Sequence, residues 1–191
     1  GKPVKTSGLF REFLVEAPKI VPVEMSQTAE GVKFEGAHSG YVPPFGLTHA
    51  RKLSLSLDGR SLVGEDLLIA LNDTTGKAAE TVLSEDIDPN VDFQIRFHLH
   101  PEVDAALDLG GTTVAIAAKS GEIWIFRHES SLFLTIEPGV YLEKNQPTPR
   151  ASRQIVLSGM VNDALTRAQW SLSKTQDTAM AIRDLRLEEL R

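Results

Sequence analysis

Apolar and polar side chains alternate along most of this chain with a period of two residues. The longest alternation covers residues 47–57, where the odd positions carry four leucines, one histidine and one arginine. Because a β-strand directs successive side chains to opposite faces, this period predicts strands that turn one face toward a core. By the same criterion we predict further strands at residues 31–38, 62–71, 91–100, 103–109, 112–118, 122–127, 132–137, 140–143, 152–158 and 168–173.

Tight-turn signals separate several of these segments. Asp58-Gly59, Gly110-Gly111 and Ser120-Gly121 are dipeptides of the kind that close β-hairpins. Many short strands with closely spaced turns favour an antiparallel sandwich over alternating β-α units. We therefore predict an all-β fold, an antiparallel two-sheet β-sandwich, with either a short helix or a frayed tail at the C-terminal end.

The predicted sandwich occupies residues 31–173. We interpret residues 1–30 as lead-in strands at a truncated start of the domain, and residues 174–191 as a helical tail. The chain begins with Gly1 and has no charged-then-apolar leader, so we expect a processed product or a piece of a longer protein. Residues 72–90 form a long polar connection, within which residues 78–83 can form a helical turn.

Composition narrows the classes of function. The net charge of −6 argues against a general nucleic-acid binder, whose surface would be basic. No apolar run has the length of a membrane span. The chain has no cysteine, which excludes disulfides and thiolate metal sites and is compatible with either the periplasm or the cytoplasm of a bacterium. The sequence motifs of serine hydrolases, phosphate-binding loops and zinc proteases are also missing.

The strand predicted at residues 91–100 carries the most distinctive polar face. One face holds Phe93, Ile95, Phe97 and Leu99, and the other holds Gln94, Arg96, His98 and His100. Arginine and protonated imidazoles all donate hydrogen bonds, so this row suits an anion such as a carboxylate or a sulfate. A zinc site on the two histidines would need a third ligand, and Arg96 would place a cation beside the metal. We therefore predict binding residues here and assign no metal ligand and no cofactor.

His49 and Arg51 occupy a strand face that is otherwise given to leucine. An unpaired arginine on a buried face would strongly destabilise the fold. Either this strand runs from the core into an open groove, or Arg51 pairs with a buried acid such as Glu65 or Asp66 on the returning strand. His38 lies between the end of a predicted strand and a glycine turn at Gly40, a position where histidine is often a turn residue bonded to the backbone.

Several segments, taken in order, resemble the heparinase II/III-like proteins. Those proteins often have a His-Asp-Gly-Tyr turn that leads into a Gly-Leu-x-His-x-Arg strand, and here Ser39 stands where aspartate is common. The similarity extends over residues 31–172. The segments that carry it are AHSGY at 37–41, FGLTHARKL at 45–53, LVGED at 62–66, RFHLHP at 96–101, WIF at 124–126 and RQIVLSG at 153–159.

This resemblance implies a β-sandwich that follows an N-terminal α/α toroid in a bacterial polysaccharide lyase. Such lyases act on acidic glycans such as heparin, heparan sulfate or alginate: they abstract the proton beside a uronate carboxyl group and eliminate the 4-linked sugar. Their catalytic tyrosine lies in the toroid. A metal site, where one is present, uses residues near the start of the sandwich, and we place none of those groups on a position of this chain.

The resemblance thus implies that this chain forms one wall of the substrate cleft and is inactive alone, without catalytic residues of its own. Its expected partners are an acidic polysaccharide and the toroid domain of the same parent protein. The expected substrate contacts are Arg96, His98, His100, His49 and Arg51. A non-catalytic carbohydrate-binding or structural β-sandwich module remains the alternative.

Overall fold

The computed structural model describes residues 21–70, 91–129, 131–144, 148–161 and 163–175, together with the backbone of residues 5–7 and 13–16. Strands dominate the described residues. They are β1 (Lys5–Ser7), β2 (Phe13–Glu16), β3 (Val23–Thr28), β4 (Gly31–Tyr41), β5 (Leu47–Ser56), β6 (Ser61–Ala70), β7 (Asp92–His98), β8 (Asp104–Asp108), β9 (Thr113–Ala117), β10 (Ile123–His128), β11 (Phe133–Tyr141), β12 (Arg150–Met160) and β13 (Leu165–Lys174). One helical turn, α1 (Val42–Phe45), and one 3-10 turn, η1 (Leu109–Gly111), interrupt them.

The strands form two main antiparallel sheets. One has the order β3-β4-β5-β6-β13-β10-β9-β8, and the other has the order β11-β12-β7; β1 and β2 pair separately. The predicted all-β, antiparallel two-sheet β-sandwich is therefore confirmed. The predicted C-terminal helix and the helical turn at residues 78–83 lie outside the described residues. No helix in the described part of the chain is long and apolar enough to cross a membrane.

By the contacts between its residues, the chain divides into two compact units. The first comprises residues 1–59, 63–93 and 159–169, and the second comprises residues 60–62, 94–158 and 170–191.

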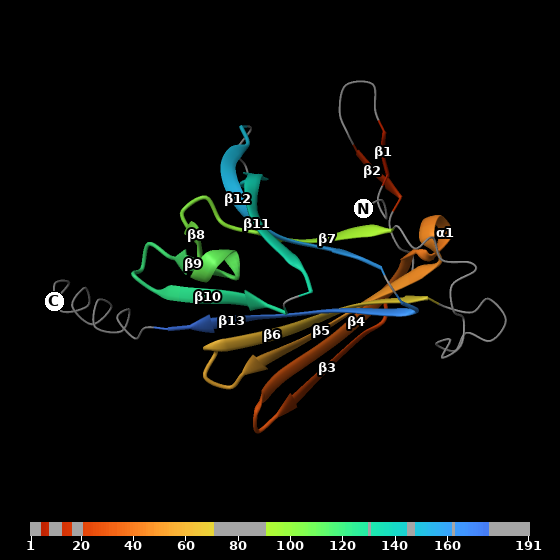
Figure 1. The fold of residues 1–191 in the computed structure, drawn as a ribbon, viewed down its shortest axis with the longest axis horizontal. Helices are drawn as coiled ribbons and strands as arrows, with labels where there is room; N and C mark the ends of the chain where they lie inside the picture. Colours follow the sequence, from red (N-terminus) through yellow and green to blue (C-terminus); the bar gives the residue numbers. More distant parts are fainter. Residues whose placement is uncertain are drawn as a thin grey trace. The chain divides into compact units, whose positions relative to one another are not determined.

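In the first unit, β3, β4 and β5 lie side by side (Figure 1). The register places Met25 opposite Phe34, and Phe34 opposite Leu53, so apolar side chains continue across three strands on one face. The turn from β3 into β4 requires Gly31. Its φ is 147°, and a Cβ atom at this position would lie 1.9 Å from the carbonyl oxygen of Leu55.

The core of the first unit gathers around Leu47, Ala70 and Val161, and Tyr41 and Phe93 pack against it. Two backbone hydrogen bonds bring distant segments to this core. The amide of Ala70 donates to the carbonyl of Ala164 at 2.8 Å, and the amide of Val161 donates to the carbonyl of Val91 at 2.9 Å. The core thus anchors the starts of both β5 and α1, the segments that flank the polar groups described below.

In the second unit, β8, β9 and β10 form consecutive antiparallel pairs. The predicted turns are present: Gly110 and Gly111 connect β8 to β9, and Gly121 connects β9 to β10, all with positive φ. The aromatic rings of Phe97, Phe126 and Trp170 pack together, with centroids 4.7–6.0 Å apart. Phe97 thus extends from the inward face of β7 into an aromatic cluster.

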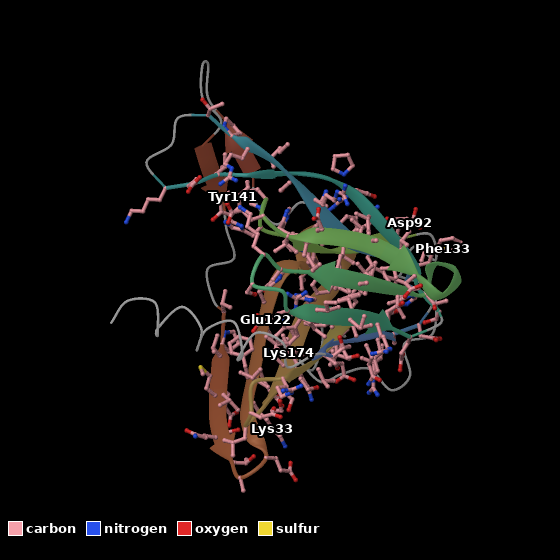
Figure 2. All side chains as sticks on the ribbon, turned by 90° about the vertical axis from the view of Figure 1, so that its left-hand side faces the viewer. Lys33, Asp92, Glu122, Phe133, Tyr141 and Lys174 are labelled. Atoms are coloured by element: carbon pink, nitrogen blue, oxygen red, sulfur yellow. The ribbon has the colours of Figure 1, made fainter. Side chains whose placement is uncertain are left out.

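An ion pair in the second unit joins the residue before β10 to the last residue of β13. Lys174 Nζ lies 2.7 Å from Glu122 Oε1, and the two side chains meet beside β10 and β13 (Figure 2). The backbone supports the same contact, because the amide of Thr175 donates to the carbonyl of Ile123 at 2.9 Å.

Two predicted strand boundaries are wrong. We expected separate strands at residues 132–137 and 140–143, but β11 runs unbroken through Pro138 and Gly139. Because β11 is an edge strand of its sheet, the missing amide hydrogen of Pro138 disrupts no central ladder. We also expected a strand to reach His100, whereas β7 ends at His98, shortly before Pro101.

Candidate functional site

The alternation predicted for β7 is present in the structure. Gln94, Arg96 and His98 are exposed, whereas Ile95 is buried and Phe97 is half-buried. The polar side chains therefore form a row on the outward face of the strand. His100 is also exposed, but it lies beyond the end of the strand.

Arg96 is held on this face by an acid from another strand. Its Nη1 atom lies 2.7 Å from Glu137 Oε2, and a second guanidinium nitrogen contacts Gln94 Oε1. Because β12 lies between β7 and β11, the ion pair spans the central strand of this sheet. Gln154 of β12, which pairs with Glu137, is buried, whereas both ionic side chains are 37% exposed. The pair is thus accessible to solvent, and sequence analysis did not identify Glu137.

The two imidazoles of the row differ in their surroundings. The imidazole of His98 makes no hydrogen bond to the described residues. His100 Nδ1 accepts a hydrogen bond from the amide of Glu102 at 3.2 Å, and its ring lies edge-on to Tyr141 at a centroid distance of 4.8 Å.

Further charges surround His100. Lys119 Nζ lies 2.7 Å from Glu102 Oε1. This hydrogen bond and the charge of Lys119 lower the pKa of the Glu102 carboxyl group, and the charges of His100 and Arg150 act in the same direction. Both cations near His100 are paired with a carboxylate, Lys119 with Glu102 and Arg150 with Glu143.

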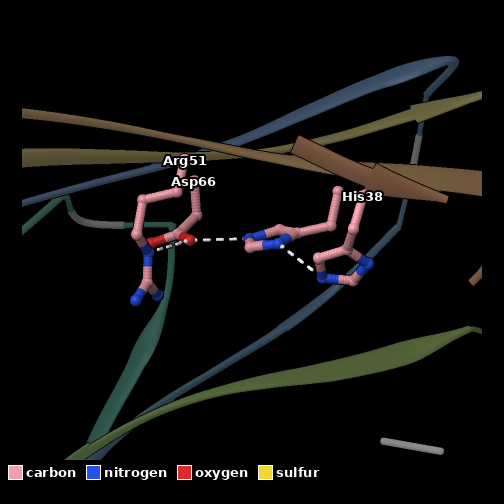
Figure 3. Close-up of polar contacts among 4 residues, drawn as sticks. His38, Arg51 and Asp66 are labelled. Atoms are coloured by element: carbon pink, nitrogen blue, oxygen red, sulfur yellow. Dashed lines mark hydrogen bonds and ion pairs between the residues drawn. The ribbon is translucent and has the colours of Figure 1, made fainter. Parts of the chain in front are cut away.

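His49 and Arg51 converge on Asp66 in the first unit (Figure 3). Arg51 Nε lies 2.7 Å from Asp66 Oδ1, and His49 Nε2 lies 2.8 Å from the same oxygen. Asp66 is only 3% exposed, whereas the side chain of Arg51 is 35% exposed. Of the two alternatives for Arg51, the structure therefore shows the pairing with a buried acid of the returning strand, and the acid is Asp66. Glu65 instead contacts Arg167 and Gln169.

His38 extends this network by one more residue. The register places it opposite His49, and His38 Nε2 lies 3.2 Å from His49 Nδ1. The amide of Gly40 donates to His38 Nδ1 at 3.2 Å, so His38 bonds the backbone as expected, but it does so within strand β4 and not in a turn. Burial, and secondarily the charge of His49, lower the pKa of His38; burial raises the pKa of Tyr41.

The structure thus separates the predicted site residues into two groups. His49 and Arg51 share Asp66 in the first unit, and Arg96, His98 and His100 lie on or just beyond β7 in the second unit. Sequence analysis missed the contact between His38 and His49, which only the register of β4 and β5 creates. Among the described residues, no group of three or more His, Asp or Glu side chains is arranged to hold a metal ion.

One protein-family model matches most of this chain. Residues 9–176 match the model of the family described as heparinase II/III-like, C-terminal. A curated relative, FtsZ-localized protein C of Caulobacter vibrioides, is 29% identical over 165 residues. That match covers 86% of this chain and 27% of the relative, so the chain spans about a quarter of the length of that protein.

Solved structures share the fold. The heparan sulfate lyase HepC of Pedobacter heparinus has a TM-score of 0.62 at 11% identity, over 84% of this chain and 23% of that one. The heparinase III BT4657 gene product has a TM-score of 0.61 at 10% identity, over 86% of this chain and 23% of that one. At such identities the likeness concerns the fold.

Proposed function

Because this chain belongs to the heparinase II/III-like C-terminal family, we propose that it is the β-sandwich domain of a polysaccharide lyase that acts on uronate-containing glycans. In this proposal the domain forms one wall of the substrate cleft, and the chemistry requires the toroid domain of the same parent protein. β-Elimination beside a uronate needs a base and a neutralised carboxylate. Exposed cationic and hydrogen-bonding side chains on the cleft wall would neutralise the uronate carboxylate.

The outward row on β7 is the observation that carries the proposal. Arg96 and His98 project from a strand whose opposite face is packed by aromatic rings, and His100 follows just beyond the end of that strand; all three side chains are exposed. A strand packed in this way holds its outward side chains at fixed spacing, as a repeating polymer requires. Guanidinium and imidazole groups bind carboxylates and sulfates through charge-assisted hydrogen bonds.

The ion pair between Arg96 and Glu137 is compatible with this role. Both side chains are 37% exposed, and a pair in water stabilises a fold by about 0–1 kcal/mol. A glycan carboxylate can therefore replace the Glu137 carboxylate at Arg96 with little loss of stability. Glu137 would compete with the glycan carboxylate for Arg96. Removing the charge of Glu137 should therefore strengthen glycan binding.

Arg51 is proposed as an additional glycan contact, and His49 as the residue that supports it. Asp66 engages Arg51 through Nε, and the two Nη atoms of Arg51 have no partner among the described residues. The buried carboxylate orients the guanidinium and leaves its outer edge available for an anion. His49 has no comparable free edge, because both of its ring nitrogens are within hydrogen-bond distance of a neighbour. In this proposal its contribution is to orient the Arg51 and Asp66 pair.

Calorimetric titration with sulfated or uronate oligosaccharides tests whether the β7 row binds glycans. The triple variant Arg96→Ala/His98→Ala/His100→Ala should bind about tenfold more weakly, since each exposed contact contributes about 0.5 kcal/mol. The matched control Arg127→Ala/His128→Ala removes the same kinds of side chain from β10 and should bind normally. Glu137→Gln should bind about twofold to fivefold more tightly. Equal affinity of the triple variant and the wild type would contradict the proposed site.

Dependence on a second domain is tested by lyase activity. The chain alone, mixed with heparan sulfate or alginate, should produce no absorbance from unsaturated uronate. Robust turnover by the chain alone would contradict the proposal that it lacks catalytic residues.

The alternative is a non-catalytic carbohydrate-binding or structural module. Two observations favour it: Asp66 holds both His49 and Arg51 internally, and the curated relative is named for its localisation with FtsZ. Glycan binding without lyase activity in the complete parent protein would support the binding module. The absence of any glycan binding would support the structural one.

A further inference from the structure

We propose that His38 and His49 form a proton-operated latch, which holds the bulge at the end of β4 closed when both imidazoles are neutral and releases it when either is protonated. This inference concerns the stability of the first unit and does not depend on the proposed function.

The direction of each hydrogen bond follows from one fixed donor. The amide of Gly40 can only donate, so His38 Nδ1 accepts, and a neutral His38 carries its proton on Nε2. His38 Nε2 then donates to His49 Nδ1, which leaves the His49 proton on Nε2. That proton points to Asp66 Oδ1, the carboxylate oxygen that accepts the last hydrogen bond of this series. The three contacts together specify the Nε2–H tautomer for both rings (Figure 3).

Adding one proton to either ring places two hydrogen-bond donors opposite each other. Protonated His38 would direct an Nδ1–H group at the Gly40 amide, which is itself a donor. Protonated His49 would direct an Nδ1–H group at the Nε2–H group of His38. In both cases two donors face each other at 3.2 Å, and one contact must open. The network is therefore satisfied in one protonation state only.

The surrounding charges do not favour a stable imidazolium at His38. Among the described residues, the charged or titratable groups beside the pair are Tyr41 on β4, Arg51 on β5 and Asp66 on β6. The ring of Tyr41 lies 5.3 Å from the ring of His38 and 6.4 Å from that of His49. Asp66 would attract an imidazolium, but its Oδ1 atom already accepts from Arg51, whose positive charge opposes a second cation nearby.

The latch controls a defined piece of structure. The pairing of β4 with β5 changes register between His38 and Tyr41, and the Gly40 amide contact holds this bulge. Tyr41 packs against the core of the first unit and leads directly into α1. Opening at Gly40 would therefore loosen the bulge and α1 while the remaining strands keep their pairing.

Nuclear magnetic resonance of the imidazole nitrogens tests the closed state directly. At pH 7.5 both His38 and His49 should show the Nε2–H tautomer. Native-state hydrogen exchange tests the opening. The protection factor of the Gly40 amide should fall as the pH decreases below about 6.5, by at most about tenfold per pH unit for one linked proton.

Variants separate the latch from a general effect of acid. His38→Gln removes one titrating ring and should make Gly40 protection much less dependent on pH. His98→Gln removes an exposed imidazole of the other unit and should leave the dependence unchanged. An Nδ1–H tautomer at His38, or protection of Gly40 that does not change between pH 7.5 and 5 in the wild type, would overturn the proposal. The tautomer measurement uses the unmodified chain and stays decisive even if His38→Gln fails to fold.

Discussion

Replacing Asp66 with asparagine should destabilise the first unit markedly. The Asp66 carboxylate is 3% exposed, and its Oδ1 atom accepts from Arg51 Nε at 2.7 Å and from His49 Nε2 at 2.8 Å. Asparagine keeps the shape of this side chain and one acceptor oxygen. It loses the charge that strengthens both hydrogen bonds, and it leaves the guanidinium of Arg51 beside a neutral group.

The magnitude follows from these contacts. A hydrogen bond to a charged group contributes about 1.5–3 kcal/mol, and an amide oxygen retains part of it. The side chain of Arg51 is 35% exposed, so water compensates for a further part of the loss. We therefore expect Asp66→Asn to lower the free energy of unfolding by about 2 kcal/mol. In a chain of this size, that change corresponds to a decrease in Tm of about 4–8 °C.

Urea denaturation, followed by tryptophan fluorescence and circular dichroism, measures the effect. Asp92→Asn is a matched control on an exposed residue, and its effect should stay within about 0.5 kcal/mol. The double variant Asp66→Asn/Arg51→Gln should lose less stability than the sum of the single variants, with a coupling energy of about 1 kcal/mol. A loss no larger than that of Asp92→Asn, or strict additivity with Arg51→Gln, would refute this reasoning.

Three further outcomes are expected. Gly31→Ala should destabilise the first unit by more than about 2 kcal/mol in urea denaturation, because φ is 147° and the new Cβ would clash with Leu55; an effect below 0.5 kcal/mol would contradict this. The free energy of unfolding should fall as the pH drops below 6.5, because burial lowers the pKa of His38 in the folded chain and the unfolded chain therefore binds more protons. If His38→Gln shows the same pH profile as the wild type, His38 is not responsible. Lys119→Ala should raise the pKa of the exposed Glu102 carboxyl group, as measured by carbon-13 titration, with little change in stability; an unchanged titration would contradict the assigned cause.

Local pattern predicted the features that depend on strand geometry. The period of two in residues 91–100 correctly separated the outward Arg96 and His98 from the inward Ile95, because pleating alone sets the faces of a strand. Glycine dipeptides likewise identified the hairpin turns, since positive φ is a local requirement. The high free energy of an unpaired charge at a buried position indicated that Arg51 needs either an open groove or a partner acid, and the contact with Asp66 decides between them.

Tertiary register determined the rest. The sequence offers both Glu65 and Asp66 as partners for Arg51, and they point to opposite faces of β6 because they are neighbours in a strand. The contact between His38 and His49 joins residues 11 apart, and a one-residue slip between β4 and β5 would abolish it. Glu137 is 41 residues from Arg96, and only the order of strands in the smaller sheet brings them together.

The glycan-binding role of the β7 row is tested most directly by titrating the isotope-labelled chain with a heparan sulfate or alginate oligosaccharide. Chemical shifts should change at Arg96, His98 and His100 and at their neighbours Glu137 and Tyr141, with smaller changes at Arg51. Shift changes confined to other surfaces, or none at millimolar oligosaccharide, would contradict the proposed role.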